Sequence, residues 1–157
     1  MYASVTYGSV GRESVAVWRT RVSRRRRVDK TGGMIRCVAF DFGEVLSSPD
    51  DLYTAPAARL GVDSAAYEAS YWEGRRAYDN GGSDASYWTP LLTRLGKRPS
   101  PELITEMAHL DASLWARMRP AAREILADVR LGGTKVAILS NAPFVLDMTF
   151  AQSDYAE

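Results

Sequence analysis

Two short apolar runs, far apart in the sequence, constrain the fold of this chain more than any other feature. The first covers residues 35–41 and ends in Asp41, at a turn that contains Gly43; the second covers residues 135–140 and ends in Ser140. Runs of this kind are typical of strands buried on both faces of a parallel sheet. Such sheets bind ligands just beyond the carboxyl ends of their strands. Asp41 is therefore predicted to lie where chemistry takes place, and a carboxylate can act as a nucleophile.

Five segments with helical patterns lie between these two runs. Capping residues and prolines mark their starts and glycines mark several of their ends, at about residues 54–61, 63–79, 83–96, 100–115 and 120–132. A further helix is predicted after Pro143. Neighbouring parallel strands need only one crossover helix, and the fifth segment can serve as that helix. The other four are predicted to form an insertion over the carboxyl end of the first strand, where a lid would lie.

The start of the chain differs from the rest in charge. Residues 1–36 carry nine Lys or Arg and two Asp or Glu, which gives net +7, whereas residues 37–157 carry eleven and seventeen, which gives net −6. Residues 1–33 are predicted to form a basic, disordered leader. Such a tail suits nucleic acid or a membrane surface, but we favour a solvated extension without a role and expect no nucleic-acid partner. Met34 is an alternative natural start.

We predict an α/β fold, with a partial Rossmann-like parallel sheet and an inserted all-helical cap. The incomplete α/β core would cover residues 34–48 and 119–157, and the helical cap residues 49–118. Cys37, the one cysteine, cannot form an internal disulfide and is predicted to be a small core residue, which fits a reducing cytoplasm. No apolar run approaches the roughly 20 residues that span a bilayer. The predicted location is cytoplasmic, with no membrane partner.

Two motifs resemble those of a known enzyme family. Phe40-Asp41-Phe42-Gly43-Glu44-Val45-Leu46 resembles the first motif of the haloacid dehalogenase-like (HAD) hydrolases. Leu139-Ser140-Asn141-Ala142-Pro143 resembles their second motif, a strand that ends in Ser or Thr. The helical insertion resembles their small cap, and bacterial members have similar residues at the cap positions Tyr71-Trp72, Arg75, Tyr78-Asp79 and Gly81. The resemblance covers about residues 34–150 and implies a HAD-like core.

The resemblance also implies a mechanism and its residues. Asp41 would be the nucleophile that attacks a phosphoryl phosphorus. Mg²⁺ would be held by the Asp41 carboxylate and the Gly43 backbone carbonyl, and would screen the repulsion between two anions. The Ser140 hydroxyl and the backbone N–H of Asn141 would bind the phosphoryl group. The implied function is a phosphatase-type hydrolase of a small phosphorylated metabolite.

Two departures from the family pattern weaken this expectation. Phosphatases of the family usually have a second Asp two residues after the nucleophile, as general acid and base, and this chain has Gly43 there. General acid–base catalysis contributes roughly 10²–10⁴ in rate. The family's Lys and acidic metal-binding pair follow its second motif, but no Lys, Arg or Asp-Asp follows Asn141, and Asp147 and Asp154 lie too close to it. The chain alone is predicted to be an N-terminal portion with impaired activity.

Side chains of the helical insertion are weaker candidates. Arg75 and Arg76 would either face the site and bind an anionic substrate or belong to a solvated helix face. Trp72, Trp88 and Trp115 are predicted to form the core of the cap. His109, the single histidine, is predicted to lie on a helix surface.

Two alternatives to a phosphatase remain open. The first is a non-catalytic HAD-fold remnant or binding module, and the second is a dehalogenase-type hydrolase, in which the nucleophile attacks carbon. The strand that ends at Asp41 is predicted to leave one apolar sheet edge bare, because no third core strand is recognised beside it. An open edge of this kind promotes pairing with another chain, so we predict self-association.

Overall fold

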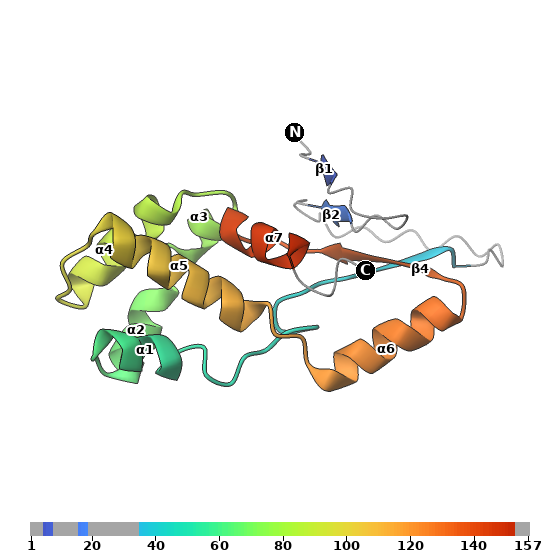
Figure 1. The fold of residues 1–157 in the computed structure, drawn as a ribbon, viewed down its shortest axis with the longest axis horizontal. Helices are drawn as coiled ribbons and strands as arrows, with labels where there is room; N and C mark the ends of the chain where they lie inside the picture. The colour runs from blue at the N-terminus through green and yellow to red at the C-terminus, as the bar shows by residue number, and fades with distance from the viewer. Residues whose placement is uncertain (1–4, 8–15, 19–34, 153–157) are drawn as a thin grey trace.

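The computed structural model describes residues 5–7, 16–18 and 35–152. Its strands are β1 (Val5–Tyr7), β2 (Ala16–Trp18), β3 (Cys37–Phe40) and β4 (Lys135–Leu139) (Figure 1). Its helices are α1 (Thr54–Leu60), α2 (Ser64–Tyr71), α3 (Arg75–Asp79), α4 (Asp84–Arg94), α5 (Pro101–Trp115), α6 (Pro120–Leu131) and α7 (Phe144–Ala151). The predicted α/β class is confirmed.

The strands form one sheet with the order β1-β2-β4-β3. β3 and β4 are parallel, with Cys37 opposite Lys135 and Phe40 opposite Ile138. β2 lies parallel to β4 on its other side, and β1 is antiparallel to β2. α6 connects β3 and β4 as the crossover helix and packs against β4. The carboxyl ends of β3 and β4 therefore point to the same edge of the sheet, toward the helical insertion (Figure 1).

Residues 5–7 and 16–18, which lie within the predicted leader, form β1 and β2. Both segments contain β-branched and aromatic residues, which favour strands. Their partners are each other and β4, and composition alone does not reveal such long-range pairing. The other residues of 1–34, including Arg24 to Arg27 and Met34, lie outside the described residues, as does Asp154.

The prediction that the first strand is buried on both faces is wrong. β3 alternates between exposed and half-buried residues, and Cys37 is exposed rather than part of the core. The reason is that β3 is at the edge of the described sheet and one face is covered. On the covered face, Phe40 and Ile138 pack against a small core around Phe42 and Ala122. The predicted bare edge is thus present in the described part of the chain.

The helices of the insertion begin and end largely where their capping residues predict. The side chains of Ser83 and Ser100 accept hydrogen bonds from backbone N–H groups at the starts of α4 and α5, and Gly61 ends α1 with a left-handed backbone. The prediction of one helix over residues 63–79 is wrong. The chain leaves the helix at Trp72, and Gly74 adopts φ of 80° before α3 begins, a conformation that favours glycine.

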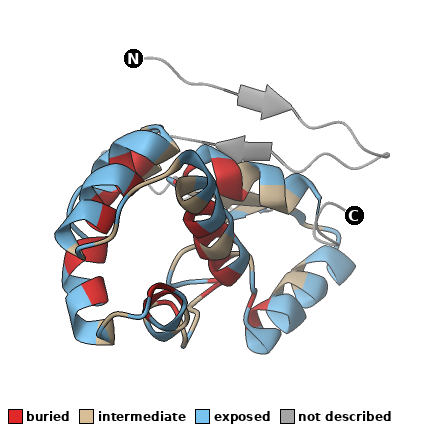
Figure 2. Cartoon of the chain, turned by 60° about the vertical axis from the view of Figure 1, so that its left-hand side comes forward, coloured by how far each residue is buried: buried red, intermediate tan, exposed pale blue. Residues whose placement is uncertain are grey.

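The main core lies inside the insertion, where Figure 2 shows buried faces turned toward one another. Its largest fully buried side chains are aromatic: Trp88, Tyr67, Tyr71 and Tyr78. α5 packs against both α4 and α7 and so connects the insertion to the α/β core. Trp88 and Trp115 are buried as predicted, and His109 is exposed as predicted. Among the described helices, none combines the length and apolar character required to cross a bilayer.

Candidate functional site

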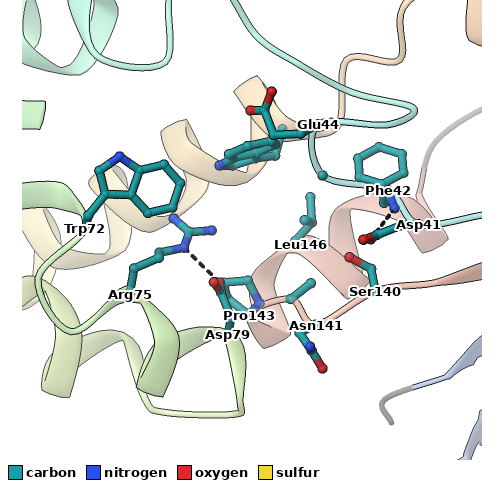
Figure 3. Close-up of a pocket in the computed structure, with 13 residues that line it drawn as sticks. Asp41, Phe42, Glu44, Trp72, Arg75, Asp79, Ser140, Asn141, Pro143 and Leu146 are labelled. Atoms are coloured by element: carbon teal, nitrogen blue, oxygen red, sulfur yellow. Dashed lines mark hydrogen bonds and ion pairs between the residues drawn. The ribbon is translucent and has the colours of Figure 1, made fainter. Parts of the chain in front are cut away.

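A pocket of about 280 Å³ lies between the carboxyl ends of β3 and β4 and the helical insertion (Figure 3). The α/β core contributes residues 41–44, 140–143 and 146. The insertion contributes Trp72, Arg75, Asp79 and Trp115. The pocket thus brings both sequence motifs together with the helical insertion.

Asp41 and Ser140 are brought together by the register of the two parallel strands. Phe40 is opposite Ile138, so Asp41 and Ser140 lie one and two residues beyond this pair, on strands that are roughly 5 Å apart. Asp41 is exposed, and its Oδ1 accepts a hydrogen bond of 2.7 Å from the N–H of Phe42. This bond orients the carboxylate and leaves its second oxygen for a ligand. Asn141 lines the same pocket.

The turn after Asp41 is tied down by backbone hydrogen bonds. The N–H groups of Leu46 and Ser47 both donate to the carbonyl of Phe42, and Glu44 N–H donates to Ser47 at 2.7 Å. Glu44 has φ of 59°, which is uncommon for a residue with a side chain and stores strain where a rigid turn holds it. Arg119, at the start of α6, donates from Nη2 to the Glu44 carbonyl at 2.9 Å. The loop beside the candidate nucleophile is therefore fixed.

Gly43 is not required by the backbone of this turn, because its φ lies outside the left-handed region. A Cβ at this position would meet Trp115 at 3.7 Å, which is ordinary van der Waals contact. The turn could therefore accommodate a side chain that it lacks. The backbone conformation therefore does not explain why a glycine stands at position 43.

Arg75 is held in place by buried partners. It is 5% exposed, and its Nε donates to Asp79 at 2.8 Å while Nη1 donates to Asp111 at 2.9 Å. Tyr71 donates to the second oxygen of Asp111 at 2.7 Å, and Trp115 donates to the Tyr71 hydroxyl at 2.8 Å. Nη1 also donates to the Tyr71 hydroxyl, and the guanidinium lies over the rings of Tyr71, Tyr78 and Tyr87. Arg75 thus lines the pocket with a fixed orientation (Figure 3).

The positive charge of Arg75 is balanced by the carboxylates of Asp79 and Asp111. Burial by itself would lower the pKa of Arg75, but Asp111, Tyr71 and Asp79 together raise it well above its usual value, so the guanidinium stays protonated. Burial raises the pKa of the Asp111 carboxyl, which Arg75 opposes. With Asp79 and Asp111 both in contact, little of the positive charge of Arg75 remains for another anion.

Trp72 departs from the sequence prediction. It is 50% exposed rather than part of the cap core, and it lines the pocket beside Arg75 (Figure 3). Its indole N–H donates to the Tyr53 hydroxyl at 3.0 Å, and its ring contacts Tyr71 edge to face at 5.1 Å. The signal in the sequence is the Glu73-Gly74 pair, which ends α2 and takes Trp72 off the buried helix face. Arg76, the other predicted binding residue, is exposed and does not line the pocket.

The described residues offer few side-chain ligands for a magnesium ion. Mg²⁺ prefers six oxygen ligands and is usually held by one or two carboxylates with water and substrate oxygens. In the described part of the chain, no three His, Cys, Asp or Glu side chains are close enough together to hold a metal. Asp41 and the Gly43 carbonyl are the two predicted ligands, and both residues line the pocket.

Comparison of the chain with family models, with curated proteins and with solved structures gave no significant match. The site is therefore interpreted from its own geometry and chemistry.

Proposed function

We propose that this protein is a HAD-like hydrolase of the phosphatase type in which Asp41 is the nucleophile. The observation that supports this most is that Asp41 and Ser140 share one pocket, at the ends of two adjacent parallel strands and beneath a helical insertion. This is the edge at which open α/β sheets bind ligands. Phosphoryl transfer also needs little from the protein beyond positioning and electrostatic stabilisation.

The proposed reaction has two steps. An Asp41 carboxylate oxygen forms a bond to phosphorus while the bond from phosphorus to the leaving oxygen breaks, and the leaving group departs with the bonding pair. Water then attacks the phosphorus, the bond to Asp41 breaks, and inorganic phosphate and a proton are released. The Ser140 hydroxyl and the Asn141 N–H would donate to the phosphoryl oxygens in both steps.

Mg²⁺ stays a proposal drawn from the family resemblance. If it binds, Asp41 and the Gly43 carbonyl would contribute two ligands, and the ion would supply positive charge near the phosphoryl group. Water and substrate oxygens would have to complete its coordination. A cytoplasmic location and a small phosphorylated substrate are part of the same proposal.

A non-catalytic HAD-fold remnant or binding module is the second candidate. The charge of the pocket favours it: Asp41, Glu44 and Asp79 line the pocket with one cation, Arg75. A phosphate dianion entering such a pocket meets repulsion that Arg75, already paired with Asp79 and Asp111, does not offset. No feature of the described pocket favours a dehalogenase-type hydrolase over a phosphatase.

Phosphate release by the full chain distinguishes these candidates. The substrate is phenyl phosphate, assayed with and without Mg²⁺, for wild type, Asp41→Asn and Ser140→Ala. Loss of the nucleophile should lower kcat by at least about 10³-fold, and loss of one phosphoryl donor by roughly 10²-fold. Asp128→Asn is the matched control, because Asp128 is an exposed carboxylate on α6 outside the pocket. Activity that survives Asp41→Asn would contradict the phosphatase, and a folded protein with no activity would favour the remnant.

A further inference from the structure

We propose that the pocket selects a substrate whose leaving group is one uncharged aromatic ring, held against Trp72. This inference rests on the proposed phosphatase function and specifies its substrate class as a small aryl phosphate monoester. Three observations support it independently: the exposure of Trp72, the matched charge of Arg75, and the missing side chain at Gly43.

Trp72 has the position and the orientation of a binding residue. Half of this large apolar side chain is exposed, which lowers stability relative to burial, yet the hydrogen bond from its indole to Tyr53 holds it in one orientation. Figure 3 shows its ring on the cap side of the pocket, across from Asp41 and Ser140. A phosphoryl group at Asp41 would therefore direct its leaving group toward the indole. Aromatic rings attract one another in stacked or edge-to-face contact.

The ion pairs of Arg75 argue against a second anionic group on the substrate. Asp79 and Asp111 both contact the guanidinium, and Asp79 itself faces the pocket. A carboxylate on the leaving group would approach Asp79 and Glu44 as well as Arg75, and repulsion would offset the attraction. An uncharged leaving group avoids this cost.

The absence of an acid at Gly43 favours a leaving group that departs without a proton. A phenol has a pKa of about 10, whereas the pKa of an alcohol is far higher and close to that of water. When the bond between phosphorus and oxygen breaks, a phenolate can carry the bonding pair and take a proton from solvent afterwards. An alkoxide needs a proton during the step, and no side chain at position 43 supplies one.

The size of the pocket limits the leaving group to about one ring. Pockets for small molecules are typically about 300–1,000 Å³, and this one, at about 280 Å³, is slightly smaller than that range. A phosphoryl group with a single six-membered ring is a suitable occupant.

Binding tests the proposal even if the chain turns over slowly. Phenylphosphonate and methylphosphonate have a P–C bond that is not hydrolysed, and each can be titrated into the full chain by calorimetry. The ring should strengthen binding by about tenfold. Trp72→Ala should abolish this difference, and Trp72→Phe should retain most of it. Ile125→Ala is the matched control, because Ile125 is 53% exposed and lies outside the pocket. A carboxylate in the para position of the ring should weaken binding.

Measurement of phosphate-ester turnover tests the proposal in a second way. Trp72→Ala should lower kcat/KM for phenyl phosphate by about tenfold more than kcat/KM for methyl phosphate. Equal binding of the two phosphonates, no binding of phenylphosphonate, or a Trp72→Ala variant that behaves as wild type would each overturn the inference. Selective binding of the ring without turnover would instead contradict the phosphatase and leave the aromatic site standing, so the two failures are distinguishable.

Discussion

Removal of Asp111 should destabilise the helical insertion because it leaves Arg75 as a buried charge without its most buried partner. Asp111 is 2% exposed and accepts hydrogen bonds from Tyr71 and from Arg75 Nη1. Removing one partner of a buried ion pair typically costs about 3–5 kcal/mol. Asp79 stays in contact with Arg75 and is less buried, so we expect the lower end, about 3 kcal/mol of the free energy of unfolding for Asp111→Ala.

Urea denaturation of the full chain measures this loss, followed by tryptophan fluorescence. With an m value of about 1.5–2 kcal/mol/M, the midpoint should fall by roughly 1.5–2 M. Asp128→Ala, an exposed carboxylate on α6, is the control and should change stability by less than about 0.5 kcal/mol. The double variant Arg75→Met/Asp111→Leu removes both charges and should recover most of the loss. A loss below about 1 kcal/mol in the free energy of unfolding for Asp111→Ala would refute this reasoning. So would a double variant whose loss equals the summed losses of Arg75→Met and Asp111→Leu measured singly.

Two further predictions concern pH and the turn after Asp41. Burial raises the pKa of four tyrosines of the insertion: Tyr67, Tyr71, Tyr78 and Tyr87. They ionise near pH 10 only after unfolding, so the unfolded state binds fewer protons above that pH and stability falls as pH rises, by up to about 5 kcal/mol per pH unit. Urea midpoints that stay constant from about pH 9 to 11 would contradict this. Gly43→Asp should raise kcat for methyl phosphate by at least about tenfold and that for phenyl phosphate much less, because a phenolate departs without a proton; equal gains would argue against the role assigned to the missing acid.

Local signals in the sequence predict the helix boundaries and the strand topology well. Ser83 and Ser100 cap helices as expected. A capping hydroxyl accepts a hydrogen bond from a backbone N–H only three residues away, so the local sequence is enough to predict it. The placement of Asp41 and Ser140 at the same edge of the sheet also follows from the sequence, since two parallel strands with one crossover must end at the same edge. Both predictions depend on rules of short range or of topology, so neither needs side-chain packing.

The rest of the site depends on contacts that no local pattern contains. Arg75 is fixed by Asp111, 36 residues further along the chain, and a helical pattern cannot distinguish this buried guanidinium from the exposed Arg76. Trp72 leaves the buried face because the helix breaks at Gly74, whereas hydrophobicity alone places it in the core. Cys37 is exposed because β3 is at the edge of the described sheet, and the apolar run gives no sign of which strands have neighbours.

The most direct test of the central claim is to trap the covalent intermediate on Asp41. The full chain is mixed with phenyl phosphate in a single turnover, quenched in acid after a few milliseconds to seconds, and digested for peptide mass spectrometry. The account predicts that the peptide containing Asp41 gains the mass of one phosphoryl group, that hydroxylamine removes it, and that Asp41→Asn never acquires it. Phosphate release without any modification of Asp41, or a phosphoryl group on another residue, would contradict the account.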